Sequence, residues 1–253
     1  MVTRVFPNSS DFENLSRLRT EAPAPASEFD YSKVVVRKPW GYEYLWHQNT
    51  AVAVWVLHLT AGSATSMHCH ARKRTSLIIL SGAAVCSTFD DRYPLAAGQA
   101  VVLEPGVFHT TMAVSPGGAC VMEVETPPLK GDLLRYRDNF GRAGQAYEGT
   151  SQYSTDFAGF DYAPLRHFNH GGAPFRFKET QLQLQVLQPG ADSFGGLAHT
   201  GLVVPFFGRL TGGRKLLADI GEAVPMQRVC TGPLVCASAL ELLHVAPVGP
   251  SIP

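Results

Sequence analysis

One stretch, residues 62–109, constrains the fold of this 253-residue chain more than any other. It holds His68 and His70 two positions apart, and in an extended strand alternate side chains lie on the same face. The apolar, β-branched run 75–80 follows and is typical of the next strand of a hairpin. The stretch therefore predicts neighbouring β-strands, with both imidazoles on one side of the first.

A third histidine lies near the end of the same stretch. Residues 99–103 have the pattern of a further strand, and the Pro-Gly pair at 105–106 turns the chain after it. This turn lets His109 approach the face that His68 and His70 share. Neutral imidazole suits Fe, Cu, Ni and Zn, so the three histidines predict a metal site. The alternative is that they are structural residues with satisfied hydrogen bonds.

The glycines around these histidines resemble the frame of the paired motifs of the cupin superfamily of small β-barrels. The matching positions are Gly62, His68, His70 and Gly82 in the first motif, and Gly98, Gly106 and His109 in the second. Thr75 stands where the first motif has a glutamate, and Glu104 and Ala113 stand where the second has proline and asparagine. The resemblance implies an all-β fold of cupin (jelly-roll) barrels, with His68, His70 and His109 as metal ligands.

The second half of the chain repeats the spacing of the first. Residues 187–190, 202–208, 217–224 and 240–245 correspond to 59–62, 77–82, 95–101 and 121–126. In this copy Gly196, Ala198 and Gly232 stand in the histidine positions, so no second metal site is expected. We therefore expect a bicupin with four parts: an N-terminal arm with a short helix (1–33), a metal-binding cupin barrel (34–142), a linker (143–165) and a degenerate second cupin barrel (166–253).

The charge and the cysteine content limit which partners and which cellular compartment we expect for this protein. Lys plus Arg equals Asp plus Glu at 21 each, which argues against a nucleic-acid or membrane surface as the main partner. The sequence shows neither an apolar run of about 20 residues nor a signal-peptide pattern. Five cysteines without a Cys-x-x-Cys pair indicate free thiols and a cytoplasmic protein. The second barrel has three possible structural roles: it packs on the first barrel, covers its mouth or forms a homodimer.

The absence of a glutamate at Thr75 narrows the chemistry. Three neutral imidazoles leave a divalent metal with its full charge and about three open positions. Such a site favours a small, anionic, metal-chelating substrate and leaves room for O2. The ligand set resembles the three-histidine Fe(II) centres of cupin dioxygenases, which implies a non-haem Fe(II)-dependent oxygenase, with Mn, Ni, Zn or Cu as the other metals.

Two other functions stay open. The segment Lys38-Pro39-Trp40-Gly41 resembles the opening of mannose-6-phosphate isomerase-like cupins. That resemblance implies a metal-dependent sugar-phosphate or nucleotide-sugar isomerase or epimerase, although those enzymes use a carboxylate ligand that Thr75 cannot supply. The third function is a non-catalytic, ligand-binding cupin.

Further candidate site residues flank the predicted ligands. Glu123 and Glu125 share one face of a strand at 119–126; if that face points inward, Glu125 is a candidate general base. Thr75 is expected near the metal without ligating it. Tyr42, with Trp40 and Trp46, is expected to form an aromatic wall over the substrate. Two short helices are expected, at 11–19 and 132–139.

Overall fold

The chain begins with strand β1 (Val2–Val5) and helix α1 (Ser9–Arg17). The computed structural model describes residues 1–18, 29–138, 140–141, 149–168, 172–190, 197, 199–230 and 238–248. Asn8 caps α1: its side chain accepts a hydrogen bond from the Asp11 amide, and the Asp11 carboxylate accepts one from the Asn8 amide. The helix therefore begins two residues before the predicted start, because Asn8 rather than Ser10 is the cap.

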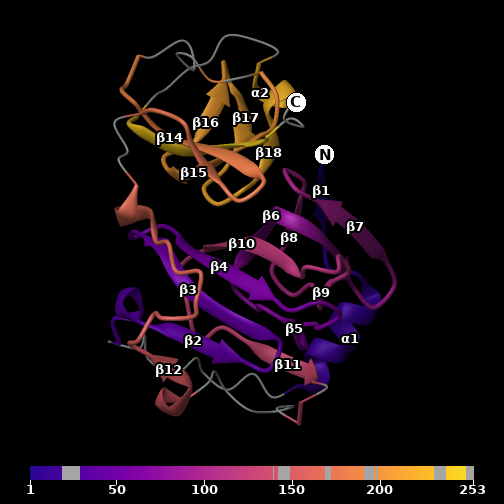
Figure 1. Cartoon of the computed structure of the whole chain (residues 1–253). Helices are drawn as coiled ribbons and strands as arrows, with labels where there is room; N and C mark the ends of the chain where they lie inside the picture. The colour runs from indigo at the N-terminus through magenta and orange to yellow at the C-terminus, as the bar shows by residue number, and fades with distance from the viewer. Residues whose placement is uncertain are drawn as a thin grey trace.

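Most of the first part of the chain belongs to one large, curved β-sheet (Figure 1). Its strand order is β1-β8-β6-β10-β4-β3-β2-β12, and β7 and β9 pair with β6 beside this path. The strands after β1 are β2 (Val35–Lys38), β3 (Gly41–Gln48), β4 (Ala53–Leu59), β6 (Arg74–Ser87), β7 (Arg92–Ala96), β8 (Ala100–Leu103), β9 (Thr110–Ala113), β10 (Ala119–Thr126) and β12 (Tyr153–Ser154). A separate pair joins β5 (Met67–Cys69) to β11 (Leu134–Arg137).

Strand β6 closes the barrel because its two halves have different partners. Residues 75–78 pair with β8, whereas residues 83–87 pair with β7 and β9. Gly82 lies between the halves with a φ of 70°, and a Cβ there would collide with the carbonyl oxygen of Gly118. The last glycine of the first motif is thus required by a bend and a close backbone approach.

Alternation along β4 separates two hydrophobic cores. Trp55 and Leu57 point into the barrel and pack in an interior cluster with Leu77 and Val121. Val52, Val54 and Val56 point the other way and belong to a second cluster. Both faces of the sheet are therefore apolar, and something must cover the outer one.

A second β unit follows, built on a five-stranded sheet of order β13-β14-β19-β15-β18. Its strands are β13 (Phe175–Phe177), β14 (Thr180–Leu187), β15 (Leu202–Phe207), β18 (Val224–Pro225) and β19 (Leu240–Pro247), with β16 (Leu210–Gly212) and β17 (Lys215–Ala218) as a separate pair. This order repeats β3-β4-β10-β6-β8 of the first sheet, in agreement with the repeat in the sequence. The exact four-part division stays a prediction, and Gly196, Ala198 and Gly232 lie outside the described residues.

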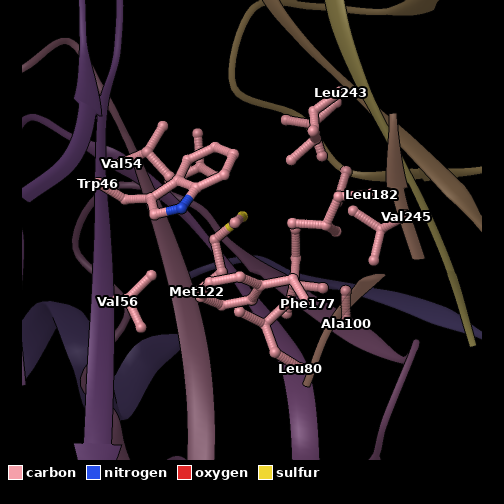
Figure 2. Close-up of a cluster of buried hydrophobic side chains, with 14 of the residues drawn as sticks. Trp46, Val54, Val56, Leu80, Ala100, Met122, Phe177, Leu182, Leu243 and Val245 are labelled. Carbon is pink, nitrogen blue, oxygen red and sulfur yellow. The ribbon is translucent and has the colours of Figure 1, made fainter. Parts of the chain in front are cut away.

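The second unit covers the outer face of the first sheet. Figure 2 shows Trp46 and Met122 of the first unit in one cluster with Phe177, Leu182 and Leu243 of the second. The Trp46 and Phe177 rings lie 6.3 Å apart in an edge-to-face arrangement. Each large side chain buried in this way contributes about 1.5–3 kcal/mol, so the contact is a shared core rather than a loose junction.

The remaining helices are short. They are α2 (Met226–Val229) and the 3₁₀ turns η1 (Tyr31–Lys33), η2 (Thr150–Gln152) and η3 (Leu165–His167). The helix predicted at 132–139 is wrong, because residues 134–137 form β11 instead. Among the described residues, no helix combines the length and the apolar character needed to cross a membrane. Cys69, Cys86 and Cys120 are buried free thiols, as predicted.

Candidate metal centre

The three predicted histidines meet inside the first barrel, which confirms that part of the sequence analysis. His68 lies on β5, His70 follows it directly, and His109 directly precedes β9. The amides and carbonyls of His68 and His109 exchange two hydrogen bonds, of 3.0 and 2.8 Å, which hold the two residues opposite each other. Their ring centroids lie 4.4 Å apart, and the His70 ring lies 5.1 Å from His68 and 5.6 Å from His109.

Backbone carbonyls orient all three rings. The Nδ1 of His68 donates to the carbonyl of Ser66 at 2.8 Å, and the Nδ1 of His109 donates to the carbonyl of Val107 at 3.0 Å. The Nδ1 of His70 donates to the carbonyl of Asp132. Each Nε2 is then left with its lone pair available, which is the arrangement that metal-ligating histidines have.

The donor atoms fit a divalent metal ion. One ring nitrogen from each histidine lies within 4.8 Å of the others, and all three residues are buried. The Nε2 of His70 is buried without a hydrogen-bond partner among the described residues. Such an atom is costly in a protein interior unless it binds something, and a metal ion would satisfy it.

The electrostatics keep the histidines neutral, as metal ligation requires. Burial is the main reason that the pKa of His70 and the pKa of His109 fall to about 4, with Lys73 adding to the effect at His70 and His70 adding to it at His109. Burial, together with His109 and His70, holds the pKa of His68 well below its usual range.

A residue that the sequence analysis missed supports this centre. The Asp132 carboxylate accepts hydrogen bonds from the amides of Arg72 and Lys73, at 2.9 and 3.0 Å, while its carbonyl accepts from His70. Asp132 therefore fixes the turn that follows His70. No local sequence signal indicates this role, because Asp132 lies 62 positions further along the chain.

The two glutamates of β10 point inward, which settles the question left open by the sequence. Glu125 accepts a 2.6 Å hydrogen bond from the Lys73 ammonium, and both side chains are buried. The other carboxylate oxygen of Glu125 has no hydrogen-bond partner among the described residues. Glu123 lies with its Oε1 3.7 Å from the Nε2 of His70. Burial raises the pKa of Glu123, and Lys73 opposes that rise.

The other two predicted site residues lie elsewhere. Thr75 faces the barrel interior opposite Glu125, yet it does not line the cavity beside the histidines. Tyr42 is on the outer face of β3: its ring stacks on His58 with centroids 4.5 Å apart, and its hydroxyl accepts from the Asp161 amide. Trp46 is in the core shared with the second unit. The predicted aromatic wall is therefore wrong for Tyr42 and Trp46, because these even-numbered positions of β3 face away from the barrel interior.

A small cavity of about 60 Å³ opens beside the three histidines. Trp40 lines it, as predicted, and so do seven charged side chains: Lys38, Glu43, Lys73, Glu123, Glu125, Lys130 and Arg135. From the sequence, Glu123 and Glu125 were weighed as residues facing this site, and Arg135 as a clamp for an anionic substrate, with surface ion pairing as its alternative role.

One group of these charges, which we call the cationic wall, comes from β2, β3 and the segment after β10. The Glu43 carboxylate lies 2.9 Å from the ammonium of Lys130 and 3.4 Å from that of Lys38. The Lys130 ammonium also lies over the ring of Trp55, 3.2 Å from its centroid. Burial alone would lower the pKa of Lys130, but Glu43 and then Glu125 outweigh it and raise that pKa. This wall is therefore cationic.

Comparisons with known proteins find similar solved structures at low sequence identity. No family model matches the sequence, and neither does any curated protein. Among solved structures, KdgF from Halomonas sp. is similar at 18% identity over 40% of this chain and 89% of that one, with a TM-score of 0.35. The cupin-superfamily sugar phosphate isomerase from Silicibacter pomeroyi gives 16% identity, 34% and 58% coverage, and a TM-score of 0.32. The Streptomyces nucleoside dehydratase Pac13 is similar at 13% identity over 45% of this chain and 92% of that one, with a TM-score of 0.37.

These likenesses cover less than half of the chain and concern the fold alone. The evidence for the fold of the first unit is internal: the antiparallel strands of the first sheet, the bend at Gly82 and the meeting of His68, His70 and His109. The first β unit of this protein has the cupin (jelly-roll) fold, with a three-histidine group that fits a divalent metal.

Proposed function

We propose that this protein is a metal-dependent enzyme that moves a proton on a small, anionic, oxygen-rich substrate, as isomerases and epimerases do. One observation carries the proposal. The buried pair of Lys73 and Glu125 lies in the cavity wall next to His70, and one Glu125 oxygen has no hydrogen-bond partner among the described residues. A carboxylate held in place by one oxygen, with the other facing a cavity, is suited to act as a general base.

A metal ion bound by His68, His70 and His109 would supply Lewis-acid polarisation of a substrate oxygen. Glu125 accepts a proton from the carbon adjacent to the polarised carbonyl carbon and returns it to the carbonyl carbon, while the hydroxyl proton on the first carbon passes to the former carbonyl oxygen, so no net oxidation occurs. Lys73 holds the Glu125 carboxylate in place through their 2.6 Å hydrogen bond. Trp40 and Leu57 in the cavity wall help to exclude water from the reacting carbon.

The charges around the cavity support an anionic substrate. The described lining residues include four cations (Lys38, Lys73, Lys130 and Arg135) and three carboxylates (Glu43, Glu123 and Glu125), a balance of +1 before any metal is added. This excess of positive charge attracts a carboxylate or phosphate group on the substrate, and we expect that group to bind at the cationic wall, beside Lys38 and Lys130.

The Fe(II)-dependent oxygenase is the second candidate, and the three-histidine group is the observation that favours it. The argument for O2 chemistry depended on a metal with no carboxylate near it. Since Glu123 and Glu125 both face the histidines, that argument is weaker than the sequence suggested, and proton transfer becomes the better-supported reaction. Fe(II), Mn, Ni, Zn and Cu are all open as the metal.

The test is an anaerobic exchange experiment. Protein loaded separately with Fe(II), Mn or Zn is incubated in D2O with a panel of sugar phosphates and sugar acids, and deuterium on carbon is measured by NMR. We expect deuterium incorporation without O2, and its loss in Glu125→Gln with metal content unchanged. Turnover that requires both Fe(II) and O2 would establish the oxygenase instead. Tight binding without any turnover would contradict both and identify a ligand-binding cupin.

Several expectations from the sequence stay predictions beside this proposal. They are a cytoplasmic location, a homodimer, and the absence of nucleic-acid and membrane partners. The small-molecule substrate is likewise proposed rather than identified.

A further inference from the structure

We propose that Glu123 is a fourth protein ligand of the metal, so that the carboxylate missing at Thr75 is supplied by the neighbouring strand. The inference rests on the three-histidine metal site but needs no particular reaction. On β6, Thr75 stands where the cupin motif has a glutamate. On β10, Glu123 and Glu125 both point to the interior of the barrel.

The pairing of β6 with β10 explains why the carboxylate has moved. Thr75 is directly opposite Glu125, and Leu77 is directly opposite Glu123. A glutamate at position 75 would lie beside Glu125 in the interior, and like charges in directly opposed positions destabilise a sheet. Threonine at 75 avoids that repulsion, so the two strands together still present carboxylate oxygens to the histidines.

The distances place Glu123 within reach of the metal position. Its Oε1 lies 3.7 Å from the Nε2 of His70, which is too far for a hydrogen bond. Two ligand atoms that each lie about 2.1 Å from one metal ion are themselves about 3.0–3.5 Å apart, so a shift of a few tenths of an ångström suffices. The Nε2 of His70 is buried and has no hydrogen-bond partner among the described residues. His70 belongs both to the three-histidine group and to a group with Glu123 and Glu125.

Glu123 rather than Glu125 is assigned as the ligand because the two carboxylates have different partners. Glu125 already accepts a 2.6 Å hydrogen bond from Lys73. Among the described residues, no donor hydrogen-bonds to Glu123, and the printed ion-pair contact of its carboxylate is the one with the Nε2 of His70. An ionised carboxylate that is largely buried and unpaired is expensive. A divalent cation between Glu123 and the histidines removes that cost.

Cobalt(II) is the probe for the test, since its visible absorption reports the number and kind of its ligands and needs no substrate. We compare the wild type with Glu123→Gln, which keeps the shape of the side chain, and with Glu125→Gln, a matched loss of charge two positions along the same face. Glu123→Gln is expected to weaken Co2+ binding by at least about tenfold and to change the spectrum. Glu125→Gln should leave the spectrum unchanged and the affinity within about threefold.

Thermal unfolding separates a ligand from a merely structural carboxylate. Without metal, Glu123→Gln removes an unpaired charge and should raise Tm by about 2–4 °C. With saturating Co2+ the increase in Tm caused by the metal should be smaller than in the wild type. A structural carboxylate would shift Tm equally in both states, and that result overturns the proposal.

Two further variants complete the test. Glu123→Asp keeps the carboxylate but shortens the side chain by one methylene, which moves the carboxylate away from the metal position. It should therefore weaken Co2+ binding if Glu123 is a ligand. The double variant Thr75→Glu with Glu123→Gln returns a carboxylate to β6 and should recover part of the lost affinity. Wild-type affinity and spectrum in both Glu123→Gln and Glu123→Asp would refute the assignment. Failure of the exchange experiment would leave these metal measurements untouched, so the two proposals are tested separately.

Discussion

The three histidines are held together by local geometry. His68 lies on β5, His70 directly follows that strand, and the turn before His109 returns the chain to it. The charged wall of the cavity is assembled from more distant parts of the chain. Lys38, Glu43 and Lys130 are brought together by strand pairing and by the segment after β10, and no short motif contains all three.

Tyr42 shows a limit of sequence reasoning at the residue scale. The alternation of β3 was visible in the sequence, but its phase was not, because a face made of Tyr42, Tyr44 and Trp46 suits the wall of a cavity as well as a core. Glu43 is the residue that faces the cavity, and Tyr42 packs on His58 and Phe160 on the outer face of the sheet. A polar residue in an otherwise aromatic strand was the one signal that indicated the correct phase.

His70→Ala should remove most of the bound metal, because two imidazoles hold a first-row ion poorly. The expected result is a loss of at least about tenfold in metal affinity, measured by elemental analysis after dialysis against a fixed free-metal concentration. His167→Ala is the control, since His167 is exposed on η3 and contacts Tyr162 rather than the cavity. Full metal occupancy in His70→Ala would mean that the three histidines are structural.

At the scale of single elements, the bend in β6 is the feature on which closure of the barrel depends. Gly82→Ala would force an alanine to a φ of 70° and push its Cβ against the Gly118 carbonyl. We expect a loss of about 2 kcal/mol in the free energy of unfolding, measured in urea. Gly117→Ala is the matched control, because a Cβ there meets open space. Equal stability of the two variants would show that the bend does not need glycine.

Strand β4 carries a second testable feature, the buried His58. Burial, and then Lys178, lowers the pKa of His58 to about 3 in the folded protein. Between pH 6.5 and 3 the unfolded chain therefore binds a proton that the folded protein does not, so stability falls as pH decreases. Each pH unit well below 6.5 costs about 1.4 kcal/mol from this residue. In His58→Phe the free energy of unfolding should fall less between pH 7 and pH 5, and an unchanged pH dependence would contradict the assignment.

The elements themselves were predictable where apolar periodicity and turns agreed, as at β4, β6, β8 and β10. Prediction failed at 132–139, where a helical pattern forms β11 instead. In this segment the pairing with β5 determines the structure: Leu134 and Arg135 pair with Cys69 and His68, and this tertiary contact outweighs the local preference for helix. Helix α1 begins two residues before its predicted start because two capping patterns overlap in the sequence, and Asn8 rather than Ser10 is the cap.

For the whole molecule, the internal repeat predicted that the second half is β-structured, and the strand order agrees. The sequence did not show where the second unit packs. Its contact with the outer face of β3, β4 and β10 follows from the apolar residues on both faces of that sheet. A hydrophobic outer face on an antiparallel sheet needs a cover, and the second β unit provides it (Figure 1).

The shared core predicts that the two units unfold together. All three tryptophans of the chain, Trp40, Trp46 and Trp55, belong to the first unit, and Trp46 also contacts Phe177 of the second, so tryptophan fluorescence reports on the first unit and on its contact with the second. Leu182→Ala is a change in the second unit, at a fully buried position in the cluster around Trp46 and Phe177. It should lower the free energy of unfolding seen by tryptophan fluorescence by about 3 kcal/mol.

Val186→Ala on the same strand is the control for that change, because Val186 is exposed and its truncation should leave the transition almost unmoved. Far-ultraviolet circular dichroism follows the strands of both units and should give the same midpoint as fluorescence in every variant. If Leu182→Ala shifted only part of the dichroism signal and left the tryptophan transition in place, the two units would be independent. In that case the second unit would stabilise itself alone, and the metal-binding barrel would tolerate its outer apolar face without a cover.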